Sequence, residues 1–83
     1  MKIVINGDYG GFGYGVSKEV TPLAKKENRT NPQLIMWVET QPHKCGDLRV
    51  VEIPNNATDW EINEYDGLEE IIYVVDGKIH YDR

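Results

Sequence analysis

The sequence predicts an α+β fold built on a small antiparallel sheet. We expect an N-terminal strand, a C-terminal three-stranded meander, and one or two short helices on one face. Three observations support this class: a β-branched run at Lys2–Asn6, a helix-start signal at Asn31-Pro32, and Asp-Gly dipeptides at 66–67 and 76–77. Because 83 residues suffice for one domain only, we assign residues 1–83 to a single domain.

The N-terminal strand ends at Asn6-Gly7, a dipeptide that is typical of turns. Residues 10–15 are rich in glycine, which weakens both helices and strands, so we expect a loop there. Thr21 and Pro22 are then the expected N-cap and first position of a short helix that ends at Asn28. A break between two turns is the open alternative, because an earlier start would place Pro22 inside the helix.

A second helix is predicted from Gln33 to Gln41. Asn31-Pro32 supplies its start signal, and Leu34, Trp37 and Val38 share one helical face. The same run of Leu, Ile, Met, Trp and Val is also compatible with a strand, which remains the alternative.

A second strand is predicted over Leu48–Ile53, and the meander follows it. Asp66-Gly67 and Asp76-Gly77 are typical of two-residue type I′ turns, which fix the register of the strands that they join. The resulting cross-strand pairs are Tyr65 with Leu68, Glu64 with Glu69, Asn63 with Glu70, Ile62 with Ile71, Trp60 with Tyr73, Val75 with Lys78, Val74 with Ile79, Tyr73 with His80 and Ile72 with Tyr81.

This register makes the middle strand of the meander apolar on both faces. One face shows Trp60, Ile62, Ile71, Tyr73 and Val75, and the other shows Ile72, Val74, Ile79 and Tyr81. Two short helices can cover only one face of the sheet, so the second face requires a partner. We expect a symmetric homo-oligomer formed through the second face. Alternatively, the glycine-rich loop or the N-terminal strand folds across it.

The register also places Glu64 opposite Glu69, and like charges at such a position destabilise a sheet by up to about 1 kcal/mol. A local conflict without visible compensation is typical of a functional site. The sequence therefore indicates a site for a divalent cation or for a basic group of a partner, unless both carboxylates turn into solvent. The expected acidic patch consists of Glu61, Glu64, Tyr65, Asp66 and Glu69.

Acidic residues are concentrated in the second half of the chain. Residues 1–42 carry five basic and four acidic side chains, whereas residues 43–83 carry four basic and ten acidic ones, giving a net charge of −5. Because nucleic-acid binding requires clustered Lys and Arg, a basic protein surface is a more plausible partner than duplex nucleic acid. The alternative is that the acidic residues serve only to keep a small protein soluble. A lone cysteine and the absence of a long apolar run indicate a cytoplasmic protein with no membrane-spanning segment.

The glycine-rich loop is the second candidate site. Backbone N–H groups in a loop between a strand and a helix can bind phosphate, and neighbouring aromatic rings can stack on a base. The loop lacks the Gly-Lys-Ser/Thr ending and the Gly-x-Gly-x-x-Gly spacing of nucleotide-binding motifs, so a purely structural loop is the alternative. Its candidate binding residues are Tyr9, Gly10, Gly11, Phe12, Gly13 and Tyr14.

The residues do not form a recognisable catalytic or metal-binding motif. His43, Cys45 and His80 are the soft metal ligands, and their spacing does not match a zinc site. Ser17 is the only serine and has no histidine near it in the sequence. We therefore expect no enzymatic activity, no metal and no cofactor.

Paired motifs stand at the two ends of the chain. They are Lys2-Ile3-Val4-Ile5-Asn6 with Tyr9-Gly10-Gly11-Phe12-Gly13, and Val51-Glu52-Ile53-Pro54 with Trp60-Glu61-Ile62-x-Glu64-Tyr65-Asp66-Gly67-x-Glu69. Together they resemble segments of small, mostly uncharacterised bacteriophage and prophage proteins. Those proteins carry a longer middle region, and this chain continues past Glu70 into a second hairpin.

The resemblance implies a phage origin, action in the cytoplasm of the host cell, and no established enzyme activity. We therefore expect a small binding protein that antagonises a host defence process by binding a host protein. The alternative is the sequestration of a nucleotide-type signalling ligand by the glycine-rich loop and its aromatic residues.

Overall fold

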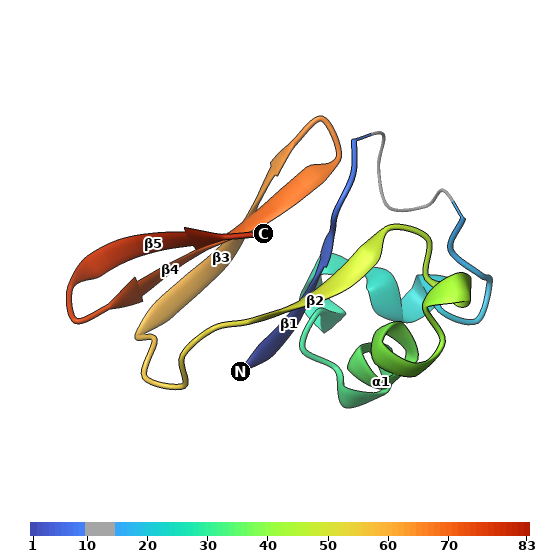
Figure 1. Ribbon diagram of the computed structural model, residues 1–83, viewed down its shortest axis with the longest axis horizontal. Coiled ribbons are helices and arrows are strands. Elements are labelled where there is room, and N and C mark those ends of the chain that lie inside the picture. Colours follow the sequence, from blue (N-terminus) through green and yellow to red (C-terminus); the bar gives the residue numbers. More distant parts are fainter. Residues whose placement is uncertain (10–14) are drawn as a thin grey trace.

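Two antiparallel sheets and a layer of short helices make up the fold (Figure 1). The computed structural model describes residues 1–9 and 15–83. A two-stranded sheet pairs β1 (Lys2–Asn6) with β2 (Leu48–Glu52). A three-stranded meander has the order β3 (Asp59–Tyr65), β4 (Leu68–Val75) and β5 (Lys78–Asp82). The α+β class, with its N-terminal strand and C-terminal meander, is thereby confirmed.

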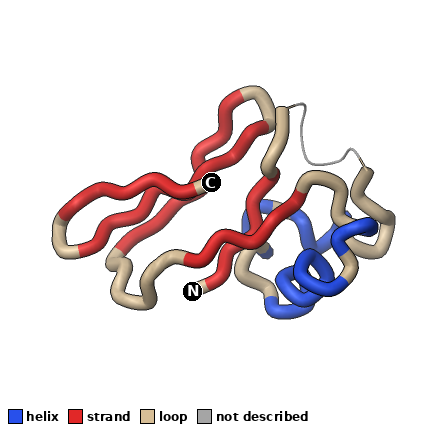
Figure 2. Tube along the Cα trace, viewed as in Figure 1, coloured by secondary structure: helices blue, strands red, loops and turns tan. Residues whose placement is uncertain are grey.

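The two-stranded sheet lies between the helices and the meander. Figure 2 shows the helices on one side of β1 and β2 and the meander on the other. Side chains alternate along a strand, so Val4 and Leu48 pack with the helices, whereas Ile3, Ile5 and Val51 pack with the meander. The helices therefore cover one face of β1–β2, and it is the two-stranded sheet that covers the meander.

The register of the meander is the one that its turns predict. Asp66 and Asp76 have φ values of 53° and 52°, and the glycines that follow them have φ values of 91° and 76°. A positive φ at both central residues defines the type I′ turn, whose twist matches that of the flanking strands. Each cross-strand pair expected from the sequence is present in β3–β4 and β4–β5.

The helix α1 spans Pro32–Thr40, which confirms the helical prediction over the strand alternative. The side chain of Asn31 caps it, because its Oδ1 accepts hydrogen bonds from the backbone N–H groups of Gln33 (2.8 Å) and Leu34 (3.3 Å). Leu34 and Val38 are its buried residues.

The expected first helix is instead two short 3-10 turns. These are η1 (Thr21–Ala24) and η2 (Lys26–Asn28), and Lys25 between them is extended, with ψ of 151°. Thr21 does not cap η1, because its Oγ1 donates to the carbonyl oxygen of Ser17 at 2.9 Å. A third 3-10 turn, η3 (Pro42–Lys44), follows α1.

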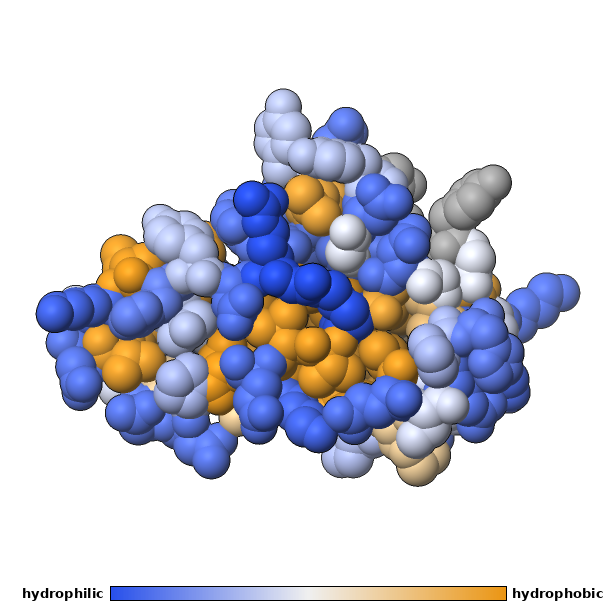
Figure 3. All heavy atoms as spheres, viewed as in Figure 1, coloured by the Kyte–Doolittle hydropathy of each residue, from blue (hydrophilic) through white to orange (hydrophobic). Residues whose placement is uncertain are grey.

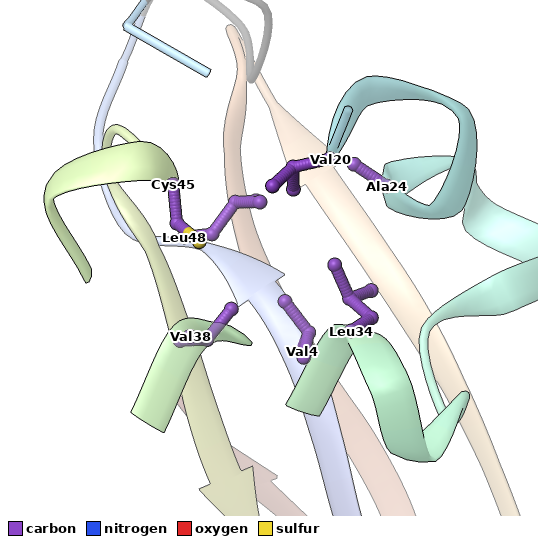
Figure 4. Packing of buried hydrophobic residues seen from close by; sticks show 7 residues of the cluster. All are labelled: Val4, Val20, Ala24, Leu34, Val38, Cys45 and Leu48. Atoms are coloured by element: carbon purple, nitrogen blue, oxygen red, sulfur yellow. The ribbon is translucent and has the colours of Figure 1, made fainter. Parts of the chain in front are cut away.

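Each face of the two-stranded sheet has its own hydrophobic cluster. The cluster on the helix side consists of Val4, Val20, Ala24, Leu34, Val38, Cys45 and Leu48 (Figure 4). The cluster on the meander side consists of Ile3, Ile5, Val51, Ile53 and Ile71, with Ala57, Trp60, Ile62 and Tyr73 packed around it. From β4, only Ile71 is a fully buried apolar side chain. The meander is thus attached through one face.

Candidate functional site

A buried ion pair joins the β3–β4 hairpin to the rest of the molecule. Arg29 and Glu69 are 1% and 2% exposed. Their side chains meet in a bidentate arrangement, with Nη1 to Oε1 at 2.6 Å and Nη2 to Oε2 at 3.1 Å. Two parallel charge-assisted hydrogen bonds fix orientation as well as distance, so this pair sets the position of the hairpin.

The same two residues hydrogen-bond the outer edge of β1, which pairs with no strand among residues 1–9 and 15–83. The N–H of Val4 donates to the backbone oxygen of Arg29 (2.8 Å), and Nη1 of Arg29 donates to the oxygen of Val4 (3.1 Å). The N–H of Asn6 donates to Oε1 of Glu69 at 2.6 Å. Because an open strand edge carries unpaired backbone groups, the ion pair takes the place of a third strand here.

Asn6 connects the end of β1 to the turn between β3 and β4. Its Nδ2 donates to the carbonyl oxygens of Gly67 (2.6 Å) and Asp8 (2.9 Å). Its Oδ1 is buried and accepts no hydrogen bond from the described residues. The tip of the hairpin is therefore held beside the segment that leads to Tyr9.

The structure explains the like-charge pair of Glu64 and Glu69. Glu69 is neutralised by Arg29, and Glu64 lies 3.4 Å from Nζ of Lys26. The basic groups come from the chain itself, in the segment around η2. The expectation that Glu69 belongs to an exposed acidic patch is therefore wrong, because Glu69 is a buried structural residue.

The remaining acidic residues of the expected patch lie on β3 and in the turn. Glu64 and Asp66 lie at the exposed end of the hairpin, whereas Glu61 pairs with Ile72 further along β3 and, by side-chain alternation, lies on the other face from Glu64. Glu61, Glu64 and Asp66 are exposed, and Tyr65 is 76% exposed. Asp66 occupies the first central position of the turn. The turn and the buried ion pair hold these side chains on a fixed framework.

A hollow of about 280 Å³ lies next to this patch. Side-chain alternation brings four of its residues to one face of the hairpin, two from β3 and two from β4. Tyr9, which is 60% exposed, lines it from the N-terminal segment. The lining residues are Tyr9, Asn63, Tyr65, Leu68, Glu70 and Arg83, together with Glu69, whose carboxylate is engaged by Arg29.

The glycine-rich candidate site lies largely outside the described residues. Gly10, Gly11, Phe12, Gly13 and Tyr14 all fall there, and only Tyr9 of this set is described. The backbone N–H of Tyr9 donates to Oδ1 of Asp8 at 2.8 Å.

The outer face of the meander continues from this hollow and is open. Ile79 and Tyr81 are 62% and 64% exposed, while Ile72 and Val74 are half-buried. A second hollow of about 180 Å³ lies along Ile72, Val74 and Ile79. In Figure 3, hydrophobic residues appear at the β4–β5 end of the meander, bordered by hydrophilic ones. The N-terminal strand covers the opposite face, so it does not cover this one.

The three soft metal ligands identified in the sequence have different environments. Cys45 is buried in the helix-side cluster, where burial raises the pKa of its thiol. His43 is exposed in η3, and the ring of His80 stacks on Tyr73 at 5.2 Å between ring centres. Within residues 1–9 and 15–83, no group of three or more His, Cys, Asp or Glu side chains could hold a metal ion.

The sequence analysis missed four lining residues of the hollow beside the hairpin tip: Asn63, Leu68, Glu70 and Arg83. The predicted register already placed the first three on one face with Tyr65, which is the signal that could have found them. Arg29 was missed as well, because its partner Glu69 is 40 positions away in the sequence.

No family model matches the chain, and no curated protein or solved structure is significantly similar to it. Among the described helices, none is long and apolar enough to cross a membrane.

Proposed function

We propose that this protein is a non-catalytic binding protein that attaches to a basic surface of another protein through the acidic end of the β3–β4 hairpin. The observation that carries the proposal is the rigid presentation of exposed acidic side chains. Glu61, Glu64 and Asp66 project from a hairpin that is fixed by the buried pair of Arg29 and Glu69. Fixed charges lose little conformational freedom on binding, which favours both affinity and correct orientation.

The charge distribution supports a basic partner. Near the tip, Nζ of Lys26 lies 3.4 Å from the carboxylate of the exposed Glu64. Both side chains remain about half exposed. Such a surface pair contributes little in water, so a partner with several basic groups can displace it at small cost. Complementary charge also accelerates association at low salt.

The resemblance to small bacteriophage proteins suggests the setting. We propose a host protein as the partner, contact in the host cytoplasm, and inhibition of a host defence process as the consequence. The inhibition would arise from occupying a surface that the host protein needs, since the proposal requires no chemical step.

The test is capture of a partner from host lysate by the immobilised protein. Partner retention should fall strongly when Glu61 and Glu64 are both changed to Lys, and it should weaken as salt is raised from about 0.05 to 0.5 M. The Glu39→Lys variant is the matched control, because Glu39 lies on α1, on the other side of β1–β2 from the meander, and pairs with the exposed Lys2. Equal loss with Glu39→Lys, or capture that ignores both salt and the hairpin charges, would contradict the proposal.

We also propose that the protein self-associates through Ile72, Val74, Ile79 and Tyr81. These residues form an apolar strip on β4 and β5, whereas the exposed acids of the same face, Asp59 and Glu61, lie on β3. A two-fold arrangement that joins the two strips keeps the acidic strands at the outside, where water screens them. Light scattering at micromolar concentration tests this arrangement, and a strict monomer would refute it.

Sequestration of a nucleotide-type ligand is the second candidate. The position of Tyr9 and Tyr65 on one hollow favours it, because aromatic rings stack on bases. The acidic surroundings oppose a phosphate group, and for this reason we rank it second. A thermal-shift screen with nucleotides separates the two candidates, since only sequestration raises the melting temperature with a nucleotide.

A further inference from the structure

The hollow beside the hairpin tip combines three kinds of recognition group. Tyr9 and Tyr65 provide two exposed aromatic rings, Leu68 provides a half-buried apolar surface, and Glu70 provides a carboxylate. Nδ2 of Asn63 lies 3.3 Å from Oε1 of Glu70, so the amide orients that carboxylate. Arg83 also lines the hollow, and it is the one cation among the described lining residues.

This set of groups suits a planar cation. A guanidinium group stacks on aromatic faces through cation–π attraction, and it donates parallel hydrogen bonds to a carboxylate. Two exposed acids lie close to the hollow, Glu61 on the same face of β3 and Asp66 in the turn after Tyr65, and they add a negative field that attracts cations and repels phosphate. The electrostatics therefore distinguish between a basic ligand and a nucleotide.

The size of the hollow agrees with a single side chain. Its volume is about 280 Å³, at the lower end of the range of roughly 300 to 1,000 Å³ that is typical of small-molecule sites, and it can accommodate one side chain. Interfaces between proteins commonly place one aromatic or arginine anchor in a pocket of this kind, surrounded by weaker contacts.

We infer that this hollow binds the guanidinium group of an arginine side chain of the partner, stacked on Tyr65 and Tyr9 and hydrogen-bonded to Glu70. This inference rests on the proposed function, for which it names the anchor. In the free protein Arg83 lowers the negative potential of the hollow, so it opposes a cationic ligand.

The experiment uses Nα-acetyl-arginine amide as the probe and follows the amide resonances of Tyr65 and Glu70 by NMR. We expect saturable shifts with the arginine probe, shifts at least tenfold weaker with the citrulline counterpart, which has the same shape without charge, and intermediate binding of the lysine counterpart. Citrulline binding as tightly as arginine would overturn the inference.

Three variants sharpen the result. Glu70→Gln keeps an acceptor for Asn63 and removes the charge, so it should weaken arginine binding about tenfold. Glu52→Gln makes the same change on the exposed side of β2, away from the hollow, and should have no effect. Arg83→Gln should tighten arginine binding several-fold. If the hollow bound an anion instead, the same variant would bind that anion more weakly. Weaker arginine binding by Arg83→Gln would overturn the inference.

The two proposals fail in different ways. If hairpin charge reversal abolishes partner capture while Glu70→Gln leaves arginine binding unchanged, the proposed function stands and the arginine site is refuted. If Glu70→Gln abolishes arginine binding while partner capture ignores the hairpin charges, the site stands and the proposed acidic interface is refuted.

Discussion

The two faces of the meander have similar sequence character and opposite surroundings. One face places Ile71 in a cluster with Ile3, Ile5, Val51 and Ile53, where it is completely buried. The other face leaves Ile79 and Tyr81 more than 60% exposed. Both are apolar enough for a core, yet only one is covered by another part of the described chain.

The difference distinguishes the residues that stabilise the fold from those that are available for binding. The inner face and the Arg29–Glu69 pair attach the meander to β1, so changes there act on folding. The outer face and the hairpin tip contribute little to folding, which leaves their side chains available for binding. Substitutions on the inner face should therefore lower stability, whereas substitutions on the outer face or at the hairpin tip should weaken binding.

The largest effect is expected from breaking the buried ion pair. Arg29→Met leaves the carboxylate of Glu69 buried without its cation, which typically lowers the free energy of unfolding by about 3–5 kcal/mol. Urea unfolding measures this loss. The double variant Arg29→Met/Glu69→Met removes both charges and should lose less than the sum of the two single variants, because the two side chains interact directly. Additive losses would show that the pair does not hold the hairpin.

The next effect compares neighbouring positions on the two faces. Ile71→Ala empties part of the inner cluster and should lower the free energy of unfolding by about 2–5 kcal/mol. Ile79→Ala, on the outer face, should change it by no more than about 0.5 kcal/mol, as expected for an exposed side chain. Thermal or urea unfolding of the two variants tests the comparison, and similar losses at both positions would remove the distinction between the faces.

A smaller effect is expected at α1, which packs on the opposite side of β1–β2 from the meander. Asn31→Ala removes the cap of α1 and should lower the free energy of unfolding by about 1 kcal/mol. Because α1 packs on the other side of β1–β2, the same variant should capture the partner like the unaltered protein. Impaired capture by a folded Asn31→Ala protein would place recognition on the helix side.

Self-association should change while the stability of the single chain does not. Replacing Ile79 and Tyr81 together by Ser removes apolar surface from the open face, so the protein should become monomeric. Its midpoint in urea should shift little at protein concentrations low enough for the unaltered protein to be monomeric too, because association itself stabilises the folded state. Light scattering at several concentrations checks the assembly, and an oligomer that survives the double replacement would locate its interface elsewhere.

The smallest effect concerns Cys45 and appears only at alkaline pH. Burial raises the pKa of its thiol in the folded state, so the unfolded chain releases this proton first as pH increases. The contribution to stability is therefore complete below about pH 8.5 and is lost above it. In urea unfolding from pH 7 to 10, Cys45→Ala should show a shallower decline than the unaltered protein; an identical decline would contradict this assignment.

The local parts of the fold could be predicted from the sequence. Asp66-Gly67 and Asp76-Gly77 determine both hairpin registers, because a two-residue turn with positive φ leaves one pairing. Asn31 and Pro32 likewise determine the start of α1. These signals act between neighbours in the chain, so no knowledge of the tertiary structure is needed.

The parts that could not be predicted depend on contacts between distant residues. The opposition of Glu64 and Glu69 indicated a missing positive charge, but nothing local identified Arg29 as its source. The single helix expected over 21–28 is divided at Lys25, which is extended. From the sequence, this break was only the alternative interpretation. The helices lie on the face of β1–β2 that carries Val4, which is buried against them. Which face of the strand they cover depends on contacts between distant residues, so the sequence did not predict it.

The difference between the two faces is tested most directly by methyl NMR with an arginine-rich peptide as the probe. Leu68 lines the hollow, whereas Ile71 is buried on the other face of β4, so Ile71 serves as the control for Leu68. We predict that the peptide shifts the methyl resonances of Leu68 and leaves those of Ile71 and Ile3 in place. Shifts at Ile71 with none at Leu68, or no shift at any of the three at millimolar peptide, would contradict the account.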